Sequence, residues 1–600
     1  MSRIGVFVCH CGINISGTVD VERVAEEIRR HPDVVFATDY SYMCSDPGQQ
    51  LVRDAITDHD LDAVVVAACS PSMHEATFRR AASSEGLNPY RVEIANIREQ
   101  CSWVHEHEPA SATHKAVEIV RSVVEKVKLD EELEPYRLPL TKRAMVIGGG
   151  IAGMQAALDI ANAGFPVILV EREDHLGGKM AQLSGTYLNF EVAPDLLRKK
   201  IDRVMAHPGI EVLTGSDVIS VDGYVGNFDV QVGRRDTGSA GSTESGSGEQ
   251  IPGEPVQQDA EALGQTLEVG AVVIATGWDP YPLNRLPEYG GGKVQDVVDE
   301  LTFESMLRDG EGPGGGLRRP SDGRVPKEVV FVQCAGSRDP EHGVSYCSKV
   351  CCMVTAKQAM MFKKRVPDGQ AYVFYIDIRS AGKGYDEYVQ EAMEKQDILY
   401  LRGKVSKIFR DGGSVRVWGA DTLSNQPIEV AADLVVLATP MLPSSEAFDI
   451  AQALRVSTDE YGFFSEAHPK LRPVESLTAG VFLAGAAQGP KDIPETVSQA
   501  SGAAAKVLQL FSHDAMTQEP TVAYVVEELC SGCGACVEVC PYEARALGPG
   551  HGPGTSQIGT VNAALCQNCG ACVVACPNKA SRIHNWTPVQ ILAMADAVMG

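Results

Sequence analysis

The sequence lacks long apolar runs, and this absence excludes a helix that crosses a membrane. Its longest apolar stretches, such as Ala63–Ala68, are far shorter than the ~20 residues that span a bilayer. A secretory signal is also missing, because Arg3 is followed only by the short apolar run Ile4–Val8, with no small-residue cleavage site. We therefore expect a cytoplasmic protein, with Ile4–Val8 as its first strand.

Basic residues are scarce as well. The chain has 53 Lys and Arg against 79 Asp and Glu, a formal net charge of −26. Phosphates would repel such a surface, so nucleic acid is not an expected partner, and the charge is most simply a source of solubility. Cysteine, in contrast, is plentiful, with 17 residues. In a reducing compartment, clustered thiols bind metal more often than they form disulfides.

The pattern of strands and helices divides the 600 residues into several segments. Alternating strands and helices in the first part predict a parallel sheet with helices between its strands. The predicted boundaries are 1–139, 140–325, 326–440, 441–518 and 519–600, where 441–518 returns to the domain begun at 140. Two stretches, Gly233–Gln265 and Gly310–Gly316, hold too few apolar residues to fold and are predicted to be flexible loops.

The last segment contains one cysteine motif twice. Each copy has the spacing C-x2-C-x2-C-x3-C followed by proline, which is the two-cluster pattern of bacterial ferredoxins. In that pattern the fourth cysteine of each copy binds the other [4Fe–4S] cluster. The predicted ligand sets are Cys530, Cys533, Cys536 and Cys576 for one cluster, and Cys566, Cys569, Cys572 and Cys540 for the other. A pair of zinc sites is the alternative, and it accounts poorly for both prolines.

A glycine-rich turn at the start of the second segment has the dinucleotide-binding fingerprint. Gly148, Gly150 and Gly153 follow the predicted strand Ala144–Ile147 and open a helix, whose N-terminus would bind a pyrophosphate. Glu171 ends the next strand, where a carboxylate accepts hydrogen bonds from the ribose. The sequence therefore predicts an FAD site. Its other predicted contacts are Ile151, Ala152, Arg172, Gly178, Lys179, Ala275, Thr276, Gly277, Gly485 and Asp492.

The order of these motifs resembles that of flavoproteins of the thioredoxin reductase type, which have two dinucleotide-binding domains. Their last helix directs its N-terminus at the flavin, and their inner domain binds NAD(P)H. In this sequence Ala486–Lys491 interrupts the family's Gly-Asp pair, so Asp492 is a provisional ribityl or phosphate contact. In the inner domain Gln333 replaces the first glycine and Cys334 follows it, which argues against a nicotinamide site.

Four cysteines lie close together in this inner segment: Cys334, Cys347, Cys351 and Cys352. The adjacent pair could form a vicinal disulfide, or all four thiols could be reduced and inert. Neither alternative explains why four thiols occur within so short a stretch. We therefore predict that the four cysteines bind a cluster.

Other motifs lie outside these segments. They are Val8–Gly12, Tyr42–Gly48, Ala68–Pro71, Asn96–His105 and Asp377–Lys383. Together with the four clustered cysteines and the ferredoxin motifs, they resemble the heterodisulfide reductase A-type family, the iron–sulfur and flavin subunits of CoB–CoM heterodisulfide reductase. The resemblance implies that the inner-domain cluster lies close to the flavin, and that the N-terminal α/β domain holds a [4Fe–4S] cluster of its own.

The implied N-terminal cluster has five candidate ligands: Cys9, Cys11, Cys44, Cys69 and Cys101. The first four follow predicted strands, whose carboxyl ends meet at one edge of a parallel sheet. A cluster needs only four thiols, so one cysteine is not a ligand; buried structural cysteines are the alternative. Some family members carry a further ferredoxin domain near Gly233–Gln265, but this stretch has no cysteine, so we expect that domain to be missing here.

The predicted fold is therefore α/β and multidomain. It comprises an N-terminal α/β parallel-sheet domain, a thioredoxin-reductase-like core with two dinucleotide-binding domains, and a C-terminal α+β ferredoxin domain. FAD exchanges electrons in pairs or singly and clusters exchange them singly, so this set of cofactors suits electron transfer. The resemblance implies flavin-based electron bifurcation, in which electrons divide between ferredoxin and a disulfide such as CoM-S-S-CoB.

The resemblance also implies partners: B- and C-type subunits, ferredoxin, and an electron-input module that is a hydrogenase, a formate dehydrogenase or an NADH-oxidising protein, in a dimeric multi-subunit complex. Lys357 is the candidate catalytic residue, placed to donate a hydrogen bond to the flavin or to offset the charge of the cluster, unless it is simply solvated. The alternative function is a self-contained NAD(P)H-dependent iron–sulfur flavoprotein oxidoreductase, which the replaced glycine disfavours.

Overall fold

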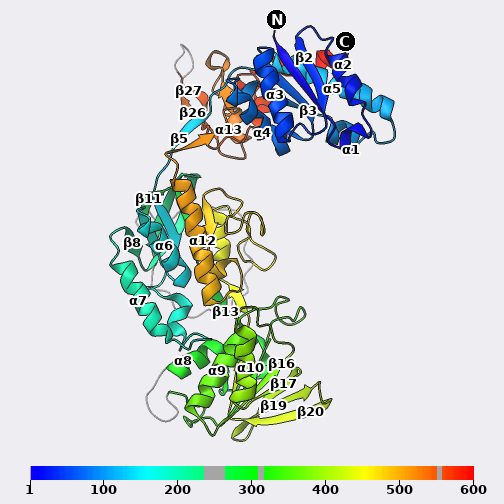
Figure 1. Ribbon diagram of the computed structural model, residues 1–600. Coiled ribbons are helices and arrows are strands. Elements are labelled where there is room, and N and C mark those ends of the chain that lie inside the picture. Colours follow the sequence, from blue (N-terminus) through cyan, green and yellow to red (C-terminus); the bar gives the residue numbers. More distant parts are fainter. Residues whose placement is uncertain (1, 236–263, 309–315, 551–556, 600) are drawn as a thin grey trace. The chain divides into compact units, whose positions relative to one another are not determined.

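The computed structural model describes residues 2–235, 264–308, 316–550 and 557–599 (Figure 1). The chain forms two compact units, one made of residues 1–138 with 515–600 and one of residues 139–514. The N-terminal and C-terminal segments thus belong to one unit, which the predicted segment boundaries do not indicate. Most of the two predicted loops lies outside the described residues, although strands extend to Arg234 and resume at Gln265.

The first unit is built on a parallel sheet with the strand order β2-β1-β3-β4. Its strands are β1 (Ile4–Cys9), β2 (Val34–Tyr40), β3 (Ala63–Ala68) and β4 (Val92–Asn96). Every residue of β1 and β3 is buried, because helices cover both faces of the sheet. The helices α2 (Val21–Ile28) and α5 (Pro109–Val127) share one core, and α3 (Asp46–Asp58) and α4 (Pro71–Ser84) share the other. The carboxyl ends of all four strands meet at one edge.

The cysteine-rich tail completes this unit. It has the strand pairs β25 (Ala523–Val525) with β28 (Ser581–Ile583) and β26 (Arg545–Pro549) with β27 (Gln557–Val561), and the short helices α13 (Ala535–Glu538) and α14 (Ala571–Ala575). The closing helix α15 (Pro588–Met599) packs against α5. The buried Asn585 fixes the contact, since its side chain accepts from the Glu131 nitrogen at 2.8 Å and donates to the Glu131 oxygen at 3.0 Å.

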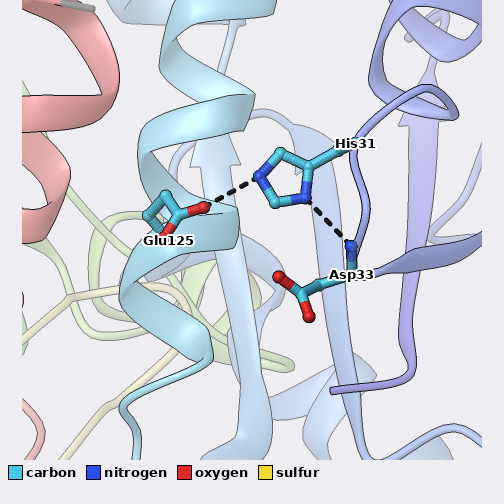
Figure 2. A group of neighbouring side chains, drawn as sticks. All are labelled: His31, Asp33 and Glu125. Atoms are coloured by element: carbon cyan, nitrogen blue, oxygen red, sulfur yellow. Dashed lines mark hydrogen bonds and ion pairs between the residues drawn. The ribbon is translucent and has the colours of Figure 1, made fainter. Parts of the chain in front are cut away.

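An ion-pair group fastens α5 to the turn before β2 (Figure 2). His31 Nε2 lies 2.8 Å from Glu125 Oε1, and the Asp33 nitrogen donates to His31 Nδ1. Lys128 Nζ lies 2.8 Å from Asp33 Oδ2 and 2.9 Å from Glu125 Oε2. Lys128 therefore already pairs with both carboxylates, and we interpret the group as structural rather than as a metal site.

The second unit contains two parallel sheets. The first has the order β23-β12-β6-β7-β8. Its strands are β6 (Ala144–Ile147), β7 (Val167–Val170), β8 (Ile210–Leu213), β12 (Ala271–Ile274) and β23 (Val481–Leu483). The helices α6 (Ile151–Asn162), α7 (Ala193–Met205) and α12 (Ile493–Phe511) cover one face. The antiparallel strands β9 (Ser216–Tyr224), β10 (Asn227–Arg234) and β11 (Gln265–Val269) cover the other.

The second parallel sheet is inserted between β12 and β23 and has the order β14-β21-β15-β16-β17. Its strands are β14 (Val297–Asp299), β15 (Glu328–Val332), β16 (Gln370–Tyr375), β17 (Ile398–Arg402) and β21 (Leu434–Leu437). The helices α8 (Glu300–Arg308), α9 (Cys351–Arg365) and α10 (Tyr385–Lys395) cover one face. The strands β18 (Val405–Asp411), β19 (Ser414–Asp421) and β20 (Gln426–Ala432) form a small sheet over the other.

No helix within the described ranges combines the length and the hydropathy that a bilayer crossing demands.

Candidate functional site

A cavity of about 820 Å³ opens in the second unit, between the two parallel sheets and their helices. Its volume is within the range of ligand and cofactor sites. It gathers most of the predicted FAD contacts, which lie far apart in the sequence. Those in its wall are Gly148, Gly150, Ile151, Ala152, Glu171, Arg172, Gly178, Lys179, Ala275, Thr276, Gly277 and Asp492. Gly153 and Gly485 are not in the wall, although both pack directly behind it.

The glycine turn between β6 and α6 has the geometry that a pyrophosphate requires. A Cβ atom on Gly153 would lie 1.8 Å from the Gly148 oxygen, so this glycine lets the helix approach the strand closely. A Cβ atom on Gly150 would have nothing within 4 Å, because this residue faces the open cavity. No side chain caps the N-terminus of α6. Its first N–H groups and its dipole are therefore available to an anion.

Glu171 has the burial expected of the fingerprint carboxylate, with 7% of its surface exposed. Its two oxygens accept from the Gly149 nitrogen at 2.5 Å and from the Glu173 nitrogen at 2.9 Å. These bonds fix the carboxylate at the wall of the cavity. On the same wall, Arg172 and Lys179 each lie within 4 Å of Asp279, so they form a charged rim rather than isolated cations.

Asp492 is the N-cap of α12, and the helix begins at the cavity. Its Oδ1 accepts from the Glu495 nitrogen, and Glu495 completes a capping box. Its Oδ2 accepts from two tyrosine hydroxyls, Tyr187 at 2.7 Å and Tyr385 at 2.6 Å. Tyr385 opens α10 of the inner sheet domain. Asp492 therefore links the two domains beside the cavity, in addition to its predicted place near the cofactor.

Lys357 is not solvated, contrary to one of the two interpretations of the sequence. Only 2% of its surface is exposed, and its Nζ donates to the Gly185 oxygen at 2.8 Å and pairs with Glu304 Oε1 at 2.7 Å. Burial alone would raise the pKa of Glu304, but the Lys357 ammonium holds it below its ordinary value. Both residues line the cavity, so a buried ion pair faces the position of the predicted cofactor.

The inner domain brings three of its four cysteines together at the carboxyl edge of its sheet. Cys334 follows β15, and Cys351 and Cys352 open α9. The pKa of the Cys334 thiol falls to about 6, because Cys351 donates a hydrogen bond to it and Arg338 lies nearby. Cys351 contacts Cys352 in the same way, and all these thiols are free, so no vicinal disulfide forms.

The fourth cysteine of this set, Cys347, is partly exposed in the loop that leads to α9 and accepts from the Lys349 nitrogen at 3.3 Å. Cys334 adopts a φ of 58°, in the left-handed region that non-glycine residues take uncommonly. Two of the four free thiols, Cys351 and Cys352, open α9, where the helix dipole stabilises the negative charge of a cluster. We call these residues the flavin-side cysteine set: Cys334, Cys347, Cys351 and Cys352.

The N-terminal domain brings four of its five candidate cysteines together at the carboxyl edge of its sheet. Cys9 and Cys69 are buried, and Cys11 and Cys44 are partly exposed. Burial raises the pKa of Cys9, and the neighbouring Cys11 and Cys44 raise it further. Arg98 Nη1 donates to Cys11 Sγ at 3.4 Å. These four thiols can therefore hold one cluster, with Arg98 to offset its charge.

Cys101 lies apart from this group. Its thiol donates to the Ala112 oxygen at 3.0 Å and is buried in the core under α2 and α5. We expect that Cys101→Ala keeps the iron content of the wild type and costs only about 1 kcal/mol of stability through the lost bond. Cys69→Ala should lower the iron content by about four atoms per chain. Iron analysis of both variants, purified without oxygen, is the test; loss of iron in Cys101→Ala alone would reverse the assignment.

The ferredoxin cysteines surround two small cavities. Each cavity is lined by three cysteines of one motif and the fourth cysteine of the other, as the crossed pattern requires. The first is lined by Cys530, Cys533, Cys536 and Cys576, and the second by Cys566, Cys569, Cys572 and Cys540. Backbone nitrogens already donate to these sulfurs, among them Gly559 to Cys530 at 3.4 Å and Ala580 to Cys576 at 3.2 Å. The residues present therefore fit two [4Fe–4S] clusters.

The fold and these sites define an iron–sulfur flavoprotein oxidoreductase, and comparison with known protein families agrees. Residues 142–332 match the pyridine nucleotide-disulphide oxidoreductase family, and residues 529–580 match the 4Fe-4S dicluster domain. Among solved structures, thioredoxin reductase of T. acidophilum covers 62% of this chain and 98% of its own, at 19% identity and a TM-score of 0.40.

The curated relatives are more specific. The chain is 42% identical to the second A-type iron-sulfur subunit of the CoB--CoM heterodisulfide reductase of Methanopyrus kandleri, over 91% of each chain. It is 38% identical to the A-type subunit of the H(2):CoB-CoM heterodisulfide,ferredoxin reductase of Methanothermobacter marburgensis, over 92% of this chain and 91% of that one. The chain therefore belongs to the heterodisulfide reductase A-type family, as the sequence motifs predict.

Several residues of these sites are not evident from the sequence. Glu304 pairs with Lys357 from a different helix, and Tyr187 and Tyr385 meet on Asp492 from two domains. None of them belongs to a motif, so only the folded chain reveals them. The sequence gives one weak indication of the role of Glu304: a second glutamate, Glu300, lies one turn before it on α8.

Proposed function

We propose that this protein is the electron-distributing component of a heterodisulfide-reductase-type complex, with one FAD and four [4Fe–4S] clusters. FAD would occupy the cavity, two clusters the ferredoxin domain, one the flavin-side cysteine set, and one Cys9, Cys11, Cys44 and Cys69. Bound FAD supplies a centre that exchanges electrons in pairs or singly. The chain's own residues bind the cofactor, keep water out, and hold a cation near it through Lys357.

One observation carries the proposal: helix α9 belongs both to the flavin cavity and to a cysteine site. Its first residues are Cys351 and Cys352, and Val354 and Lys357, less than two turns on, line the cavity. In an ordinary nicotinamide domain this helix N-terminus would receive the dinucleotide phosphates. Here thiols occupy that position, which favours a cluster over NAD(P)H as the redox neighbour of the flavin.

The names of the relatives support a role in electron transfer between several partner proteins. One relative is named for H(2), CoB-CoM heterodisulfide and ferredoxin, and a relative from Methanococcus maripaludis is named for H(2)/formate. We propose that this chain likewise divides electrons by bifurcation between ferredoxin and a disulfide of the CoM-S-S-CoB type. B- and C-type subunits would carry out the disulfide chemistry, and a hydrogenase, formate dehydrogenase or NADH-oxidising module would supply the electrons. This work would take place in the reducing cytoplasm, in a dimeric complex.

The composition of the protein tests this proposal. We expect about sixteen irons per chain from four clusters, together with one FAD. Iron and flavin are measured on protein purified without oxygen. A measured content of about eight irons per chain would mean that the two proposed clusters outside the ferredoxin domain are not present. Rapid bleaching of the isolated protein by NADH or NADPH would favour the self-contained oxidoreductase instead.

We further expect that the Lys357 ammonium raises the reduction potential of the flavin, since a nearby cation stabilises its reduced anionic form. Lys357→Met alone would leave the buried Glu304 carboxylate unpaired, at a cost of about 3–5 kcal/mol. The double variant with Glu304→Gln avoids this cost. Its flavin midpoint potential, measured against a reference dye, should be more negative than that of Glu304→Gln alone, which lacks the same carboxylate but keeps Lys357.

The control for this prediction is Lys364→Met, the same change at an exposed position of α9. Its flavin potential should equal that of the wild type. If Glu304→Gln and the double variant, both with FAD bound, have the same flavin potential, Lys357 does not act on the flavin.

A further inference from the structure

Two buried polar side chains at the flavin-side cysteine set have unused hydrogen-bonding capacity. Gln333 is 5% exposed, and its Nε2 has no hydrogen-bond partner. Ser337 is 2% exposed, and its Oγ has none either. A buried donor without a partner costs about 1–3 kcal/mol, so a native protein rarely keeps two of them at one site without a use.

Both residues lie next to the cysteines. Gln333 Oε1 lies 3.5 Å from Cys352 Sγ. Ser337 lies three residues after Cys334, and its backbone nitrogen donates to the Cys334 oxygen at 3.3 Å. Both residues belong to the turn after β15, which also holds Cys334. The turn therefore presents two polar side chains and one ligand to the same small volume.

The protonation of the thiols explains why the amide nitrogen of Gln333 has no hydrogen-bond partner. As a thiol, Cys352 donates its proton to Gln333 Oε1. As a cluster ligand it is a thiolate with no proton to donate and is only an acceptor. Rotation of the amide by half a turn then presents Nε2 to the same sulfur, and the hydroxyl of Ser337 rotates freely enough to donate as well.

We propose that Gln333 and Ser337 donate hydrogen bonds to the sulfur atoms of the flavin-side cluster and raise its reduction potential. This inference rests on the proposed function, which places a cluster at these cysteines. The reduced cluster carries one more negative charge than the oxidised one, so hydrogen bonds to its sulfurs stabilise the reduced form more. The glutamine that replaces the first glycine of the nicotinamide motif thus has a positive role: it favours passage of one electron from the reduced flavin to the oxidised cluster.

Backbone N–H groups also donate hydrogen bonds to the cysteine sulfurs and should raise the reduction potential of the cluster in the same way. The Arg379 nitrogen donates to Cys352 Sγ at 3.4 Å, and the Lys349 nitrogen donates to Cys347 Sγ at 3.3 Å. Only a change to proline would remove either donor, and it would also disturb the backbone. Gln333 and Ser337 are therefore the positions at which the potential is open to test.

The test uses the holoprotein with Gln333→Leu and Ser337→Ala, singly and combined. The midpoint potential of the flavin-side cluster is measured by redox titration with electron paramagnetic resonance, and the signal is assigned by its absence in Cys347→Ser. We expect both single variants to keep the wild-type iron content and to have a more negative potential. In the double variant the ratio of reduced to oxidised cluster at the wild-type midpoint should fall about tenfold, or about 59 mV for one electron.

A matched control lies on the same sheet. Gln370 begins β16 at the opposite edge from the cysteines, where its Nε2 donates to the Asp397 oxygen at 3.0 Å. Gln370→Leu should leave the potential unchanged. An intact cluster with an unchanged potential in the double variant overturns the inference and leaves the proposed function standing. If the wild-type protein has no paramagnetic signal that disappears in Cys347→Ser, no cluster lies at these cysteines, and both the inference and the proposed function are wrong.

Discussion

Gly150→Asp is expected to remove FAD from the protein while the fold is retained. The new side chain would enter open space, since a Cβ atom at this position has no neighbour within 4 Å and the φ of −73° suits any residue. Gly150 is also the N-cap of α6, a position where aspartate stabilises helices. The fold should therefore keep its stability. The cofactor, however, would meet a carboxylate where its phosphates belong.

Repulsion between this carboxylate and two phosphates, together with loss of the free helix N-terminus, should weaken FAD binding by about 3 kcal/mol or more, roughly a hundredfold. Flavin absorbance per chain after gel filtration gives the answer. The control is Gly413→Asp, which adds the same group in open space on the small sheet of the inner domain. Full retention of the yellow cofactor by Gly150→Asp would place FAD elsewhere.

Cys347→Ser is expected to remove the flavin-side cluster and nothing else. Cys347 is partly exposed in its loop, so the change should cost little packing. Serine keeps the shape of the side chain but is a far weaker ligand for iron than a thiolate. We expect the iron content to fall by about four atoms per chain, with FAD and both ferredoxin clusters retained. An unchanged iron content would mean that these four thiols do not hold a cluster.

The sequence predicts the parts of this molecule that depend on local order. Gly148, Gly150 and Gly153 follow a buried strand and open a helix, and the ferredoxin cysteines repeat a fixed spacing, so both sites can be recognised from neighbours in the chain. The carboxyl edge of a parallel sheet predicts that Cys9, Cys11, Cys44 and Cys69 meet. The structure brings these four together in one region.

The remaining features depend on contacts between residues distant in the sequence. Burial of Lys357 requires its ion pair with Glu304 from another helix, and the sequence around Lys357 does not reveal that partner. Cys101 follows β4, the last strand of the same sheet, but its thiol turns to the core beneath α5 and bonds to Ala112. The first and last segments join in one unit through Asn585 and α15. The apolar residues of α15 could have packed elsewhere, so the sequence does not predict this contact.

Electron flow from flavin through the flavin-side cluster is the central claim, and one measurement addresses it directly. Wild type and Cys347→Ser, both holding FAD and their ferredoxin clusters, are reduced anaerobically at the flavin and frozen after short intervals. The ferredoxin-type signals are then followed by electron paramagnetic resonance. The account predicts that these clusters become reduced in the wild type and stay oxidised in the variant while its flavin is reduced. Reduction of the ferredoxin clusters at the wild-type rate in Cys347→Ser would contradict it.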